Sequence, residues 1–112
     1  MDKLASKERI EHILQSIAYI HEFMDGVTED SFLLDVKLQS AIQYQFLILG
    51  EATRFLDNDL LEKYSYPWHI PKSFRNFIIH EYFGVKMELI FQATQELDEL
   101  EMQLSMMLKN EF

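Results

Sequence analysis

Apolar residues recur at three- and four-residue spacing along most of the chain, with polar residues between them. In the segment from Lys3 to Asp25, this spacing joins six apolar positions: Ile10, Ile13, Leu14, Ile17, Ile20 and Met24. Such spacing places these side chains on one face of a helix. The pattern therefore predicts an amphipathic first helix, which Gly26 closes as a left-handed cap.

The second helical segment has two candidate starts. Thr28 is a good N-cap ahead of two acidic residues, and Asp35 is another. The helix is expected to continue to about Asp57. Gly50 lies in its middle, where glycine costs about 1 kcal/mol relative to alanine. We therefore predict that another helix crosses closely at Gly50.

The helical pattern lapses between residues 58 and 71, which predicts one long connection. Pro71 suits the first position of a third helix, because that position needs no amide proton. This helix is expected to carry Ser73 to Phe83 and to end at Gly84.

A last helix is predicted from Lys86 to about Lys109, with Ile90, Leu97 and Leu104 at heptad spacing. No strand and no internal repeat is expected. The pattern predicts an all-α fold, an up-and-down antiparallel bundle of four to five helices. Residues 1–112 are expected to form a single domain, since chains of this size build one core.

Composition narrows the classes of function. The chain has no cysteine, which excludes disulfides and thiolate metal sites. No apolar stretch reaches the roughly eighteen residues of a membrane span, so we expect no membrane association and a cytoplasmic protein. The net charge is −9, yet residues 63–86 carry +3 and the remainder −12. If the chain binds an anion, it is expected to do so at residues 63–86, although a chance scatter of four cations explains the excess equally well.

The third helix holds the densest cluster of side chains that could take part in catalysis: Arg75, Asn76, His80 and Tyr82. Histidine can transfer a proton near neutral pH, and the planar guanidinium of arginine suits phosphate. Together they could process a phosphodiester. A surface arginine and a structurally satisfied histidine remain the alternative.

Helix geometry constrains this cluster. At about 100° per residue, Arg75 and Tyr82 nearly eclipse each other, whereas Arg75 and His80 lie about 140° apart. One straight helix would not direct all these side chains at one point. Either Arg75 lies in an irregular first turn, or a second copy of the chain completes the site across a two-fold axis.

Other candidates are weaker. His12 and His21 lie about 180° apart on the first helix and cannot hold one metal ion together, so no metal site is predicted. Trp68 either anchors the connection in the core or stacks on a base. Glu51 either reaches the third-helix cluster or is simply solvated.

These residues resemble the HepT-like group of HEPN domains (DUF86), which are toxins of HEPN/MNT toxin–antitoxin systems. The resemblance covers most of the chain. It rests on Ala41, Gly50-Glu51-Ala52, Pro67-Trp68, Ile70, Arg75-Asn76, Ile79-His80, Tyr82 and Val85.

The resemblance implies a metal-independent endoribonuclease without cofactor, active at a homodimer cleft. Arg75 would bind the scissile phosphate of an RNA substrate, His80 would transfer a proton as the ribose 2′-hydroxyl attacks, and Asn76 would orient the substrate or the histidine. The partner it implies is an MNT-type nucleotidyltransferase antitoxin, which would neutralise the toxin by transferring AMP to Tyr82.

Two other functions stay open on the sequence. The chain could be a non-catalytic module that binds a substrate or partner for a nucleotidyltransferase, using the same cleft. It could also be a degenerate dimeric scaffold.

Overall fold

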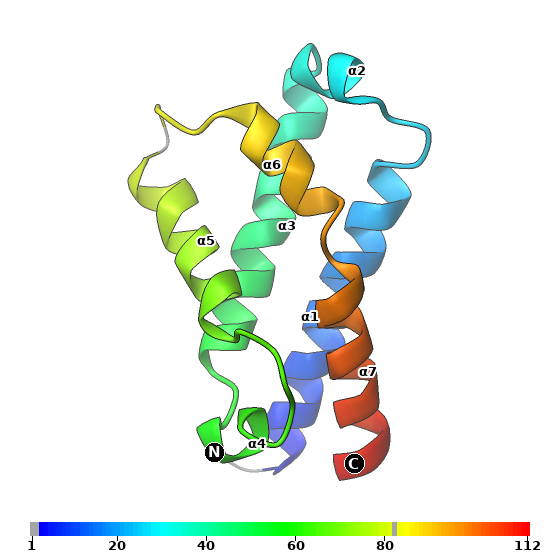
Figure 1. The fold of residues 1–112 in the computed structure, drawn as a ribbon, viewed down its shortest axis with the longest axis vertical. Helices are drawn as coiled ribbons and strands as arrows, with labels where there is room; N and C mark the ends of the chain where they lie inside the picture. The colour runs from blue at the N-terminus through cyan, green and yellow to red at the C-terminus, as the bar shows by residue number, and fades with distance from the viewer. Residues whose placement is uncertain (1–2, 82) are drawn as a thin grey trace.

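Two long helices, α1 (Lys3–Phe23) and α3 (Val36–Arg54), run side by side along the molecule in opposite directions (Figure 1). The computed structural model describes residues 3–81 and 83–112. Within these ranges the chain forms seven helices and no strand. The other five are α2 (Glu29–Leu33), α4 (Asn58–Leu61), α5 (His69–His80), α6 (Met87–Thr94) and α7 (Asp98–Glu111).

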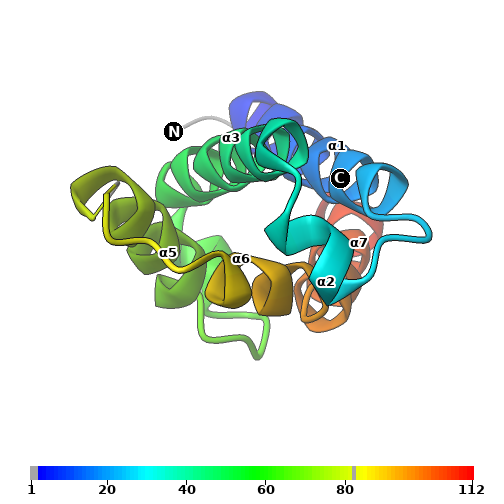
Figure 2. The same ribbon diagram turned by 90° about the horizontal axis from the view of Figure 1, so that it is seen from above.

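The predicted all-α, up-and-down bundle is confirmed. Helices α1, α3, α5 and α7 alternate in direction in Figure 1. The short α2 and α4 have only five and four residues, which leaves five longer helices. Helix α7 lies against α1, while α5 packs mainly against α3 at the edge of the bundle (Figure 2).

The predicted helix ends follow local side-chain chemistry. Gly26 takes a φ of 73°, a left-handed conformation that suits glycine. Thr28 and Ser31 form a capping box in which each side chain accepts from the other residue's backbone N–H, at 3.1 Å. Asp35 Oδ1 accepts from Leu38 N–H at 3.0 Å and begins α3. Both candidate starts are therefore used, one for α2 and one for α3.

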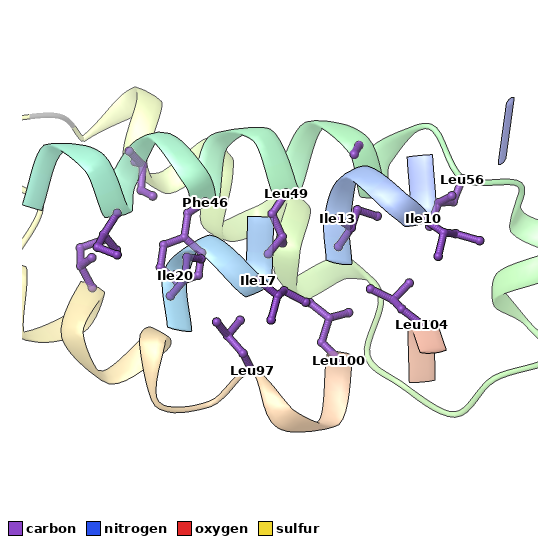
Figure 3. Packing of buried hydrophobic residues seen from close by; sticks show 14 of the residues in the cluster. Ile10, Ile13, Ile17, Ile20, Phe46, Leu49, Leu56, Leu97, Leu100 and Leu104 are labelled. Atoms are coloured by element: carbon purple, nitrogen blue, oxygen red, sulfur yellow. The ribbon is translucent and has the colours of Figure 1, made fainter. Parts of the chain in front are cut away.

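The core lies between α1, α3 and α7 (Figure 3). It is formed by the apolar stripes of these helices, including Ile10, Ile13, Ile17, Ile20, Phe46, Leu49, Leu56, Leu97, Leu100 and Leu104. Full burial of a side chain of this size stabilises a fold by about 1.5–3 kcal/mol. The repeating isoleucines of α1 thus hold the first helix against both neighbours.

Helix α5 differs from its predicted bounds at both ends. It begins at His69, so Pro71 is its third residue. Proline is accommodated there because the first four N–H groups of a helix have no intrahelical partner. The helix ends at His80, three residues before the predicted end at Phe83. The backbone then turns, with Gly84 N–H donating to Glu81 O at 2.6 Å.

The single last helix predicted from Lys86 to Lys109 is wrong, because the chain breaks between α6 and α7. At the break, Gln95 N–H donates to Gln92 O and Glu96 N–H to Ala93 O, which tightens the turn. Helix α6 packs against α2 and α3, whereas α7 packs against α1, and one straight helix could not reach both sets. The acidic residues after Leu97 suit a new helix start.

The connection before α5 is anchored by Trp68. Its indole Nε1 donates to Tyr64 O at 3.0 Å, and its ring packs 4.9 Å from that of Tyr66. Of the two interpretations of Trp68, the structure supports the anchor. The connection also contains the short α4, begun by Asp57, so it is less irregular than predicted.

Helices α3 and α5 cross at Gly50, as predicted. A Cβ atom on Gly50 would lie 2.5 Å from Arg75 Cβ and 2.7 Å from Pro71 O. These distances are too short for any side chain unless the backbones separate. The missing side chain of Gly50 therefore sets how closely α5 approaches α3.

We expect Gly50→Ala to lower the free energy of unfolding by about 1–3 kcal/mol, because the added methyl group overpacks a backbone contact. Urea denaturation followed by circular dichroism measures this change. Gly84→Ala is the matched control, since its Cβ would meet no atom nearer than 3.7 Å. Equal effects of the two substitutions would contradict the close crossing.

Candidate active site

Arg75 lies where α5 crosses α3, and its guanidinium is held from two sides. Its Nε lies 2.9 Å from Glu51 Oε2 in an ion pair, and its Nη1 donates to Asn76 Oδ1 at 3.0 Å. Only 23% of the Arg75 side chain is exposed. Two contacts on a planar group fix its orientation, so Arg75 is placed before any ligand arrives.

Glu51 joins two arginines. Its Oε1 lies 3.6 Å from Arg54 Nη1, while its Oε2 faces Arg75. The sequence left open whether Glu51 reaches the third-helix cluster, and the structure shows that it does. Because Gly50 allows α5 to come close, the adjacent glutamate meets the arginine directly.

A pocket of about 420 Å³ opens beside Arg75. Three helices line it: α1 on one side, α3 at the centre and α5 on the other. The lining residues are Arg9, His12, Leu47, Ile48, Glu51, Ala52, Arg75 and Ile79. Its charged groups are two arginines and one glutamate, with one histidine beside them, so the pocket suits a small anionic group.

His80 does not line this pocket. It is the last residue of α5 and is exposed to solvent. Arg75 is the seventh residue of the same helix, so an irregular first turn around Arg75 is ruled out. In a regular helix the two side chains lie about 140° apart. A single copy of the chain thus presents the arginine and the histidine in different directions.

Asn76 contacts Arg75 and not His80. Its side-chain carbonyl accepts from the arginine, and no hydrogen bond joins it to His80 among the residues that the structure describes. The predicted role of orienting a histidine therefore finds no support within one subunit. Tyr82, the predicted modification site, lies outside the described residues.

A second groove, apolar and about 440 Å³, lies on the other side of α5. Its lining includes Phe74 and Phe77 of α5, together with Leu89, Tyr66 and Glu96. Burial and the nearby Glu99 and Glu96 carboxylates raise the pKa of Tyr66. Tyr66 is therefore neutral at pH 7 and supplies no phenolate to this groove.

Arg9 and Arg54 were not predicted as site residues. They come from α1 and α3, outside the basic segment 63–86, and packing brings them near Arg75. Lys63, one cation of that segment, forms an ion pair with Glu111 instead, with 3.1 Å between Nζ and Oε1. The i,i+3 spacing of Glu51 and Arg54 was a sequence signal for that pair, whereas no spacing in the sequence placed Arg9 near them.

Residues 3–81 and 83–112 provide neither a cluster of metal ligands nor a membrane-spanning helix. This part of the chain contains no group of three or more histidine, aspartate or glutamate side chains placed to hold a metal ion. None of its helices combines the length and apolar character needed to cross a membrane.

Comparison with known proteins points to one family. The profile of the family described as "Ribonuclease HepT-like" matches residues 13–107. A protein of Caldanaerobacter subterraneus subsp. tengcongensis, named "Putative RNase", is 36% identical over 104 residues, covering 91% of this chain and 93% of that protein. No solved structure matches the chain with comparable significance.

Two archaeal proteins are similar over nearly the same span. "Probable ribonuclease HepT" of Thermococcus cleftensis is 32% identical over 95 residues, covering 84% of this chain and 86% of that protein. A "Putative RNase" of Methanocaldococcus jannaschii is 31% identical over 97 residues, covering 86% and 89%. The matched region includes α3 and α5, which carry Glu51 and Arg75.

Proposed function

This chain belongs to the HepT-like ribonuclease family, and on that premise we propose that it cleaves RNA without a metal ion. The observation that carries the proposal is the guanidinium of Arg75. It is held by Glu51 and Asn76 at the wall of a pocket, on the same helix as an exposed histidine. A fixed planar cation and a titratable base are the groups that phosphodiester cleavage requires.

The chemistry is internal transesterification. Arg75 binds a non-bridging oxygen of the scissile phosphate and stabilises the charge that develops there. His80 takes the proton of the ribose 2′-hydroxyl as that oxygen attacks phosphorus. The bond from phosphorus to the 5′-oxygen breaks, this oxygen takes a proton from water, and His80 returns its own proton to the solvent. The products are a 2′,3′-cyclic phosphate and a 5′-hydroxyl end.

We expect the purified protein to cleave single-stranded RNA in EDTA and His80→Ala to lower the rate by roughly 10²–10⁴-fold, since a general base contributes about that much. Fluorescent oligoribonucleotides on denaturing gels measure the rate. A 2′-O-methyl strand should stay intact because it lacks the attacking hydroxyl.

His69→Ala is the matched control, as His69 is exposed at the other end of α5. Full activity of His80→Ala would refute the role of His80. Binding without cleavage by the native protein would favour the non-catalytic module.

Activity is proposed to need a homodimer. Arg75 and His80 diverge by about 140° on one regular helix, so they act together only across two copies. Helix α5 lies at the edge of the bundle, where α3 is its main neighbour and the opposite side is uncovered (Figure 2). A two-fold axis near α5 would bring the arginine of one subunit toward the histidine of the other.

Two inactive variants should therefore complement each other. When Arg75→Gln and His80→Ala chains are co-expressed, random pairing makes half of the dimers mixed, and each mixed dimer retains one cleft with both native groups. We expect about a quarter of the native rate, measured on the same RNA. Mixed dimers as inactive as either parent would show that the two groups act within one subunit.

Regulation is proposed to act at Tyr82. An MNT-type nucleotidyltransferase antitoxin would transfer AMP from ATP to the tyrosine hydroxyl, with release of pyrophosphate. The added phosphate and nucleoside would compete with RNA for the cation at Arg75, seven residues earlier in the sequence.

Co-expression with such an enzyme should add one or more AMP units to the peptide that contains Tyr82 and stop RNA cleavage. Intact-mass and peptide mass spectrometry measure the modification. Tyr82→Phe should remove it, while Tyr44→Phe should not, although Tyr44 is 61% exposed on α3. Modification that persists in Tyr82→Phe would place the acceptor elsewhere.

A further inference from the structure

All three arginines of the chain gather on one face of the molecule. Arg9 of α1 and Arg54 of α3 both lie over the ring of Phe55, with guanidinium carbons 4.8 and 5.0 Å from its centroid. Arg54 then faces Glu51, which pairs with Arg75. The arginine face, defined as Arg9, Arg54 and Arg75 with Phe55 and Glu51, thus crosses three helices without a break.

Arg9 is the arginine of this face that has no acidic partner among the described residues. No described residue forms an ion pair or hydrogen bond with it, and its Nε is shielded from water without a partner. It lines the pocket beside Arg75, next to His12. A shielded N–H group without an acceptor is unfavourable, and a ligand phosphate in the pocket would accept from it and compensate the charge of Arg9.

The stacking on Phe55 prepares two guanidinium groups for a ligand. An aromatic ring within about 6 Å of a guanidinium restrains its plane and leaves its N–H edge free for phosphate. Phe55 is 38% exposed, and the Arg54 side chain is 47% exposed, so both are accessible. A chain of net charge −9 that collects its arginines beside one pocket has a site for a polyanion there.

We propose that the arginine face binds the phosphate backbone of the single-stranded RNA next to the scissile phosphate. Arg75 holds the scissile phosphate, and the strand continues over α3 to Arg54 and Arg9, where a neighbouring phosphate enters the pocket. Glu51 occupies the space between Arg54 and Arg75 until the strand arrives, and competes with it. This inference rests on the proposed function for the position of the scissile bond.

The test is binding of a fluorescent ten-nucleotide 2′-O-methyl RNA, which binds but offers no 2′-hydroxyl for cleavage. We expect Arg9→Gln and Arg54→Gln each to weaken binding roughly five- to tenfold and to reduce the salt slope of log K by about 0.7, the value for one phosphate contact on a single strand. Lys37→Gln is the matched control, because it removes one exposed positive charge at the first turn of α3. It should change affinity less than about twofold.

Glu51→Gln supplies a readout of opposite sign. Loss of its charge should tighten binding roughly two- to fivefold, whereas a merely disturbed fold would weaken it. Equal effects of Arg9→Gln and Lys37→Gln, or unchanged affinity in both arginine variants, would overturn the proposal. Binding by the arginine face without cleavage would contradict the proposed nuclease while supporting this inference. A cleavage rate that is unchanged in the Arg9 and Arg54 variants would support the proposed nuclease and contradict this inference.

Discussion

The close crossing of α3 and α5 is the contact on which the candidate site depends. Gly50 lacks the side chain that would hold the helices apart, and Arg75 Cβ lies only 2.5 Å from where a Cβ of residue 50 would stand. The next residue, Glu51, meets the arginine at 2.9 Å as a result. The close crossing that Gly50 permits thus allows the ion pair to form, and the ion pair orients the guanidinium that lines the pocket.

The position of α5 at the edge of the bundle has a second consequence. A helix packed mainly against one neighbour keeps polar groups accessible, and the core between α1, α3 and α7 does not need its outer side (Figures 2 and 3). The same regular helix turns Arg75 and His80 apart. The bundle therefore supplies a stable support for both groups without completing a cleft by itself.

The chain is acidic overall, but its charge is unevenly distributed over the surface. This uneven distribution makes the net charge compatible with the proposed RNA substrate. The arginine face concentrates Arg9, Arg54 and Arg75 against Glu51, whereas Lys63 is paired with Glu111 away from it. Local positive charge is felt within about 8–10 Å at physiological salt, so the distant carboxylates matter little at the pocket. Their repulsion would limit RNA binding along the rest of the surface and would favour short, transient contacts.

Local patterns in the sequence determined the helical class and the caps at Gly26, Thr28 and Asp35, because each depends on residues a few positions apart. Gly50 indicated that a helix crosses closely there, but packing decided that the crossing helix is α5. The break before α7 depended on α6 and α7 packing against different helices, which no heptad count reveals. The clustering of Arg9 and Arg54 beside Arg75, and the engagement of Glu51, were decided by tertiary structure alone. These side chains belong to three helices, and their distances exist only once the apolar stripes have packed.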